Sequence, residues 1–596
     1  MLSVLFVTAA LGAILSGATE LFDRNLAYSS PFANAPHLSH NTRSLKARHV
    51  AFAKRQSQLD DTQSSNGFTD EHYPTFYGGD FSASPWIYNG GINFTHSVAS
   101  GDPFDDSVLL WTRAVPIGSS LPDQSIPVCV SFKIFNNERL SGRPVDSGEA
   151  FTSYDVDFTL KVEAKNLKPD TSYWFQFADC TNPKTTSPIG ATRTISSPNT
   201  VLAIKTAIST RMAWLLITHP QISSFTSAIT FMNLWAMVGN VGYGSAKIGR
   251  KTLGRELATI ADYRLRLNQY RTDVSLLDAH VKAPWITVCF SPSGACFTDR
   301  KLAAVRAYHE WMPIRQVDPD DKLRIWRNFQ IGKLLDLTML DTRQYDRDIT
   351  DLYYNTECKS YTDLEIVPTH HQVVTVIDSI ADEESRSLMG SEQENWFFDT
   401  LSASRERGAI WRIVGQQIVF TQLNESGFDV DAWDGYRANR ERVLNHLYNE
   451  KISNTIILSG DSHANWVSDL AHPDDTTTYD PLTGKGAIGV EFAGTAVTSS
   501  SPFGAGIQPV AADKISQVFV QINEDLQWSE GSYRGFFTLT LNTTNAVATY
   551  YAMRNISSAN LDAFASATFV VEAGANKLAR PVAGGTVQAG VLKVQG

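Results

Sequence analysis

The chain has 596 residues, of which 43% are hydrophobic and 19% are charged, and its formal net charge is -11. One hydrophobic core rarely serves a chain of this length, so we expect two domains with additional tails. The composition excludes a disordered or fibrous protein. The negative charge argues against broad nucleic-acid binding and against an acidic membrane surface as partner, because both need a basic face.

Residues 1–18 have the pattern of a secretory signal peptide. Their apolar run is short for a membrane-spanning helix, and the small residues Gly17 and Ala18 suit a cleavage site. The first residues lack Lys and Arg, so a buried or anchoring helix is the alternative. Glycosylation triplets support secretion to the extracellular space or cell wall. They begin at Asn93, Asn424, Asn542 and Asn555.

Residues 19–93 are rich in Ser, Asn, His and Pro and lack periodicity, which indicates a surface-draped arm or a pro-segment. Within them, Lys54-Arg55 is either a processing site or a solvated pair. Residues 94–193 alternate apolar and polar positions in strand-length runs, which predicts a β-sandwich. The runs cover 107–113, 128–135 and 172–177.

The stretch Leu167–Tyr173 resembles the corner of fibronectin type III domains, where a Tyr hydroxyl bonds back to the chain. The chain has five cysteines, which cannot all pair with one another. Cys129 and Cys180 lie in strand-like segments and could form a disulfide. Cys289 and Cys296 flank a short loop and could close it, which would leave Cys358 over.

Residues 200–560 alternate helical and strand patterns, and residues 561–596 form a C-terminal segment. Apolar spacing predicts helices over 255–281 and over 297–313, the second stopped by Pro313. Apolar strands that run into polar loops are predicted at 333–343, 454–463 and 486–500. The α/β fold class expected from this order is a sandwich followed by a layered αββα domain.

The strongest site signal is SGDSHANW at 459–466, directly after an apolar strand. Asp461 and His463 lie two residues apart on one loop, so both can face one metal ion. The alternative is a strand-end turn with a capping Asp and an ordinary surface His. We predict Asp461 and His463 as metal ligands and as catalytic residues.

Arg343 lies in Asp341-Thr-Arg-Gln-Tyr345, which has the same strand-to-loop setting. Its guanidinium could hold a phosphate through two parallel hydrogen bonds, and we predict it as the third catalytic residue. A structural Asp–Arg pair is the alternative. Gly415-Gln-Gln417 either offers amide donors near the site or ends a plain strand.

These segments together resemble the PhoD-type alkaline phosphatase family over roughly residues 94–560. The resemblance implies a sandwich followed by a metallophosphoesterase domain that hydrolyses phosphate mono- and diesters with ferric iron (Fe3+) and calcium (Ca2+). Its motifs occur in the family's order. They are Val98–Pro103, Leu110–Arg113, Phe297–Lys301, Glu310–Arg315, Asp341–Tyr345, Gly415–Gln417, Asp431–Tyr436 and Gly460–His463.

The chain departs from the family pattern at two places. Family members carry a Cys on the first catalytic strand and then a His-Leu-Gly-Asp-Tyr-Ile-Tyr segment, whose Asp bridges the metals. The corresponding residues 204–240 contain no Cys and no acidic residue, although Tyr243 follows nearby. The family's Trp-Asp-Asp-His-Glu block and a downstream Asn ligand are also missing after Val288. A multimetal site needs bridging carboxylates, so we expect impaired metal binding.

Two explanations of these gaps compete. The first is an error in the gene structure assigned to the chain, with a shifted frame over about 204–240 and a skipped exon near 288. The second is a true pseudoenzyme. We favour the first, because the resemblance resumes abruptly at Gly244–Arg250. A membrane helix over 213–238 is a further alternative, although His219, Pro220 and Gln221 interrupt its apolar run.

Two functional hypotheses follow. One is a secreted phosphatase acting on phosphate esters and impaired by its incomplete site. The other is a non-catalytic secreted protein that binds a partner or phosphate weakly on the same scaffold. A serine hydrolase is disfavoured, because the chain has no Gly-x-Ser-x-Gly elbow.

Overall fold

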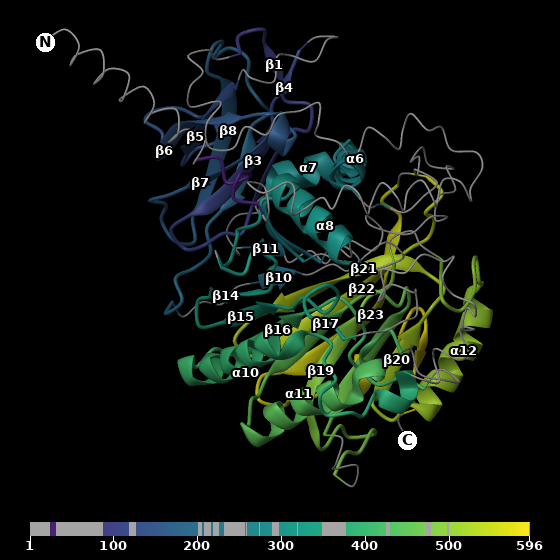
Figure 1. Ribbon diagram of the computed structural model, residues 1–596. Coiled ribbons are helices and arrows are strands. Elements are labelled where there is room, and N and C mark those ends of the chain that lie inside the picture. The colour runs from purple at the N-terminus through teal and green to yellow at the C-terminus, as the bar shows by residue number, and fades with distance from the viewer. Residues whose placement is uncertain are drawn as a thin grey trace, which may run out of the picture. The chain divides into compact units, whose positions relative to one another are not determined.

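The structure is a computed structural model in which the chain forms two compact units (Figure 1). Unit 1 comprises residues 1–195, 237–285 and 293–324, and unit 2 comprises residues 196–236, 286–292 and 325–596. The residues described are 24–30, 88–117, 127–200, 205–207, 216–218, 226–231, 257, 259–272, 274–288, 297–318, 320–348, 377–424, 430–472, 478–496, 500–558 and 560–594.

Unit 1 contains the strands that the sequence predicts for a sandwich. A four-stranded antiparallel sheet has the order β6-β5-β8-β9. Its strands are β5 (Val128–Phe135), β6 (Asp146–Thr152), β8 (Ser172–Asp179) and β9 (Gly190–Arg193). A second sheet runs β2-β3-β7, and β13 joins β2 in parallel. Its strands are β2 (Val98–Gly101), β3 (Val108–Arg113), β7 (Thr159–Ala164) and β13 (Pro284–Val288), of which Pro284 and Trp285 belong to unit 1.

The two sheets share one hydrophobic core, so the predicted packing of sheet on sheet is observed. Val130 and Phe132 of β5 lie in the same buried cluster as Leu110 of β3 and Val162 of β7. Alternate residues of β8 are buried, as expected where one face of a strand covers a core. The strands β1 (Ile92–Asn93) and β4 (Val115–Pro116) pair beside this core.

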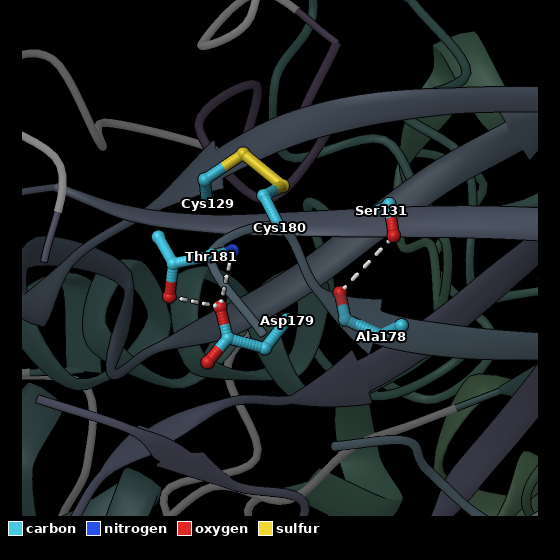
Figure 2. The surroundings of a disulfide bond; sticks show 6 residues. All are labelled: Cys129, Ser131, Ala178, Asp179, Cys180 and Thr181. Atoms are coloured by element: carbon cyan, nitrogen blue, oxygen red, sulfur yellow. Dashed lines mark hydrogen bonds between the residues drawn. A yellow bond between two sulfur atoms is a disulfide. The ribbon is translucent and has the colours of Figure 1, made fainter. Parts of the chain in front are cut away.

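The predicted tyrosine corner is confirmed, because Tyr173 Oη accepts a hydrogen bond of 2.7 Å from the backbone N–H of Lys168. The predicted disulfide between Cys129 and Cys180 is also present, with Cα atoms 5.5 Å apart (Figure 2). It joins the facing ends of the neighbouring strands β5 and β8. The other three cysteines lie outside the described residues.

The single helix predicted over 255–281 is wrong, because the chain forms two helices there. They are α6 (Ile260–Tyr270), which begins with a capping box, and α7 (Val274–Lys282). Arg271 follows the last residue of α6, and its side chain is buried. It donates to the Trp311 carbonyl at 3.0 Å and lies 4.2 Å from the centre of the Trp111 ring. The predicted helix at 297–313 is observed as α8 (Phe297–Trp311).

Unit 1 also includes these helices, which the sequence pattern assigns to the second domain. Family motifs explain part of this placement. Arg315 donates its backbone N–H to Asp102 Oδ2 at 2.8 Å, and its guanidinium pairs with Glu163. Trp111 Nε1 donates to the carbonyl of Glu310 at 2.8 Å. The motifs around residues 98–103, 110–113 and 310–315 therefore hold the helices and the sandwich together within one unit.

Unit 2 is built around an eight-stranded sheet with the order β14-β15-β16-β17-β19-β18-β20-β24. The run from β15 to β19 is parallel. The strands are β14 (Arg327–Ile331), β15 (Leu335–Met339), β16 (Trp411–Gly415), β17 (Thr455–Ser459), β18 (Asn465–Ala471), β19 (Ala487–Ala493), β20 (Leu526–Glu530) and β24 (Val591–Leu592). The predicted strands at 333–343, 454–463 and 486–500 thus fall on β15, β17 and β19.

A helix layer covers one face of this sheet, and a second sheet covers the other. Leu401 of α10 (Gly390–Arg407) and Leu444 of α11 (Arg437–Asn449) share a buried cluster with Ile457 of β17. On the opposite face, Phe492 contacts Phe537 and Phe569, at 6.2 and 6.4 Å between ring centroids. These two belong to an antiparallel sheet of β21 (Arg534–Leu541), β22 (Asn545–Met553) and β23 (Ala563–Glu572).

The described residues of unit 2 therefore supply three layers of the αββα order. The helix α12 (Pro509–Ile522) packs on Trp466 through Phe519. The C-terminal segment is part of the fold, since β23 pairs with β22 and β24 with β20.

Within residues 204–240, the described parts are three short antiparallel strands. They are β10 (Lys205–Ala207), β11 (Leu216–Thr218) and β12 (Thr226–Phe231). Two of them lie where a membrane helix over 213–238 was the alternative, so that alternative is wrong for these residues. Across the described parts of the chain, no helix has the length and apolar character needed to cross a membrane. The missing block after Val288 falls outside the described residues.

Candidate active site

The predicted site residues follow neighbouring strands of unit 2. The strands β15, β16 and β17 are adjacent and parallel, so the loops after them lie at one edge of the sheet. Arg343 follows β15, and Asp461 and His463 follow β17. Open α/β sheets bind ligands at this edge, which is why strand-to-loop signals identify it from the sequence.

Arg343 and Asp461 contact each other directly. Arg343 Nη2 pairs with Asp461 Oδ2, and Nη1 pairs with Asp431 Oδ2 at 2.9 Å. The Arg343 side chain is 0% exposed, whereas the Asp461 side chain is 22% exposed. Two carboxylates thus occupy the terminal nitrogens of the guanidinium. A phosphate would have to displace one of them, and phosphate binding by Arg343 stays a prediction.

Asp431 is the centre of this charge cluster. Arg347 Nη2 pairs with Asp431 Oδ1 at 2.7 Å, and Arg347 Nε donates to Tyr436 Oη at 3.0 Å. Burial alone would raise the pKa of Asp431, but Arg343 and Arg347 outweigh burial and lower it. Burial raises the pKa of Tyr436. Asp431 and Tyr436 lie in one motif of the family, but the sequence alone predicts no role for either residue.

The loop after β17 has an unusual backbone. Asp461 and His463 have φ angles of 73° and 61°, in the left-handed region that residues with a Cβ seldom occupy. The His463 carbonyl accepts hydrogen bonds from Arg534 Nη1 at 2.8 Å and from Thr495 Oγ1 at 3.0 Å. Surrounding residues therefore hold the His463 backbone in a conformation that the loop alone would not favour.

The ring of His463 has a defined orientation. Its Nδ1 lies 2.9 Å from the carbonyl oxygen of Ser500. Because a carbonyl only accepts, Nδ1 carries the proton, and the neutral ring then has its lone pair on Nε2. A carbonyl partner of this kind commonly fixes the tautomer of metal-binding histidines.

Gln417 and Asp341 shape the loop after β15. Gln417 donates to the Leu340 carbonyl and accepts from the Thr342 N–H, each at 2.8 Å. Asp341 Oδ1 accepts the backbone N–H groups of Arg343 and Gln344, at 3.1 and 3.0 Å. These contacts join the ends of neighbouring strands. The geometry therefore favours the interpretation that Gly415–Gln417 ends a strand rather than offering amide donors to a ligand.

A buried carboxylate that the sequence did not single out lies beneath the loop after β17. Glu491 of β19 is 1% exposed and accepts the backbone N–H groups of Phe420 and Thr421, both at 2.7 Å. It also accepts from the hydroxyl of Ser459, the last residue of β17. Its only sequence signal is an acidic residue inside an apolar strand pattern. Glu491 ties the end of β17 to the chain after β16.

The described residues do not fit the multimetal site that the family resemblance implies. Among them, three or more ligand groups come within 4.8 Å of one another only at Cys129, Glu149 and Cys180. Those two cysteines form the disulfide and cannot act as thiolates. At the candidate site, Asp461 and His463 would supply two ligands, and Arg343 pairs with the Asp461 carboxylate. Iron and calcium sites need more oxygen or nitrogen donors than these two.

Two stretches of this chain match models of one protein family. Residues 82–196 match the family description "PhoD-like phosphatase, N-terminal domain", and residues 291–550 match "PhoD-like phosphatase". The chain is 30% identical over 539 residues to alkaline phosphatase D of Bacillus subtilis (strain 168), which covers 84% of each sequence. A solved structure titled "Structure of PhoD" matches with a TM-score of 0.64 and 27% identity. It covers 85% of this chain and 95% of that one.

Proposed function

Because this chain belongs to the PhoD-like phosphatase family, we propose that it is a secreted phosphomonoesterase or phosphodiesterase by descent whose turnover is impaired with the present sequence. The observation that supports impaired turnover is the ion pair that Asp461 forms with Arg343. Its carboxylate pairs with the buried Arg343, and the described residues bring no third ligand to Asp461 and His463. The proposed cofactors of an intact site are iron and calcium, and the proposed substrate is a phosphate ester.

The residues of this chain would act mainly by positioning. Arg534 and Thr495 hold the His463 backbone, and the Ser500 carbonyl orients its ring. Bound metal would supply charge stabilisation and an activated water in a complete site. This chain orients His463, but its described residues supply only two candidate ligands at this site, which are too few to hold such ions.

The purified full-length protein should be assayed with p-nitrophenyl phosphate and bis-p-nitrophenyl phosphate in the presence of iron and calcium. We expect kcat/KM at least about a hundredfold below that of Bacillus subtilis alkaline phosphatase D measured in parallel, because metal ions contribute several kcal/mol to the barrier. Turnover comparable to that relative would contradict the impairment. Sequencing the transcript across codons 200–300 would show whether the gaps belong to the natural protein.

Secretion is the second part of the proposal. Disulfides persist in oxidising compartments, and this chain has one between Cys129 and Cys180. The glycosylation triplets support it too, since Asn93, Asn424 and Asn555 are exposed and Asn542 is half-buried. Expression in a secreting host should give a mature N-terminus just after residue 18 and a mass that falls on glycosidase treatment. An uncleaved, cell-retained chain would contradict this part.

A further inference from the structure

The short segment Arg24–Ser30 lies at one open side of the sandwich, far in sequence from the strands that it contacts. The strand β6 is an edge strand of the four-stranded sheet, and β7 is an edge strand of the second sheet. Among the strands that the structure describes, none pairs with the outer edge of β6 or of β7. Edges of this kind bind additional chain segments through backbone hydrogen bonds.

Asn25 bridges these two edges with every hydrogen-bonding position of its amide. Its Nδ2 donates to the carbonyls of Phe151 in β6 and Thr159 in β7, both at 3.0 Å. Its Oδ1 accepts the N–H groups of Lys161 and Ala27, also at 3.0 Å. Asn25 is 1% exposed, so this side chain satisfies buried backbone groups of both sheets.

The neighbouring residues extend the contact. The Leu26 N–H donates to the Lys161 carbonyl at 2.7 Å, which continues the edge pairing along β7. The hydroxyls of Tyr28 and Ser153 lie 2.5 Å apart. Ala27 is fully buried and Ser30 is 4% exposed. Each end of the segment is therefore fixed to the sandwich, and the contact is wider than one side chain.

We propose that the edges of β6 and β7 form a peptide-docking site, which residues 24–30 of the same chain occupy. These residues stay bound as part of a separate peptide when the chain is cut at Lys54-Arg55. The segment lies after the expected signal-peptide cleavage, so the mature chain keeps it. Residues 24–30 are then a docking element, and cleavage at Lys54-Arg55 would leave the edges of β6 and β7 covered.

The test uses the full chain with a recognition sequence for a site-specific protease placed at Lys54-Arg55. After cleavage, gel filtration with mass spectrometry should find the N-terminal fragment with the rest of the protein in equal amounts. Asn25→Ala should raise the dissociation constant of the fragment by roughly tenfold or more, because it leaves buried backbone groups unpaired. Ser29→Ala, at an exposed position of the same segment, is the matched control and should behave as the parent.

Tyr28→Phe keeps the test decisive should Asn25→Ala fail to fold, because it removes only the hydroxyl that contacts Ser153. It should weaken retention by about threefold to tenfold. Loss of the parent fragment from a protein whose circular dichroism is unchanged would overturn the proposal. Equal retention of parent and Asn25→Ala fragments would overturn it as well, and so would a dimer that exchanges segments between copies.

Discussion

Glu310 in unit 1 and Asp461 in unit 2 are both carboxylates of family motifs that face arginines, yet their surroundings differ. Glu310 is fully buried, and Arg264 and Arg306 bind its two oxygens at 2.7 to 2.9 Å. Asp461 is partly exposed, and its carboxylate pairs with Arg343. Glu310 thus forms a buried charge cluster with Arg264 and Arg306, whereas the Asp461 side chain keeps the exposure that a ligand-binding residue needs. The burial of a carboxylate and its ion-pair partners therefore distinguish a structural role from a candidate binding role, which the sequence motif alone does not.

The largest effect is expected at Glu310. The Glu310→Ala substitution leaves Arg264 and Arg306 buried without their carboxylate. We expect the free energy of unfolding to fall by about 3–5 kcal/mol. Chemical denaturation followed by circular dichroism measures this. Glu572→Ala, at an exposed position, is the matched control, and a Glu310→Ala change as small as the control's would show that the cluster is not structural.

A smaller effect is expected at Asp431, and it should depend on pH. The pKa of Asp431 is lowered in the folded state. Its contribution to the free energy of unfolding is therefore fully present above the unfolded carboxyl pKa of about 3.9 and is lost as the pH falls toward the folded-state pKa. The stability difference between the parent and Asp431→Asn should therefore be constant from pH 7 to 5 and shrink below about pH 4. Asp562→Asn, in an exposed pair with Arg554, should show almost no difference at any pH. A difference that grows on acidification would contradict the arginine cluster.

The smallest effect is expected at the tyrosine corner. Tyr173→Phe removes the acceptor of the Lys168 N–H and keeps the buried ring, so the free energy of unfolding should fall by about 1 kcal/mol. Tyr448→Phe, at an exposed tyrosine, controls for the loss of a hydroxyl. Thermal unfolding of the two variants gives the comparison. Identical transitions would show that the corner bond adds nothing to stability.

Local patterns made much of the fold predictable. The strand over 128–135, the tyrosine corner and the disulfide between Cys129 and Cys180 depend on alternation and short motifs, and they were found. The break between α6 and α7 was missed, because no Gly or Pro marks it in the sequence. The contacts of Arg271 with Trp311 and Trp111 exist only after the chain has folded, so they give no local signal either.

The candidate site was predictable in position but not in its partners. The sequence predicted that Arg343, Asp461 and His463 follow strands in polar loops, and the structure brings these loops to one edge of the sheet. Asp431 was missed as the second partner of Arg343, because 88 residues separate the two. The docking of Asn25 on Phe151 and Thr159 was missed for the same reason, since neither side of that contact has a local signature.

Metal content gives the most direct test of whether Asp461 and His463 alone can hold the family's ions. The full-length protein and its Asp461→Asn variant should be loaded with iron and calcium, desalted and measured by inductively coupled plasma mass spectrometry. Substoichiometric iron in both proteins, with no difference between them, is the expected result. One iron per chain in the parent, lost in Asp461→Asn, would contradict the incomplete site.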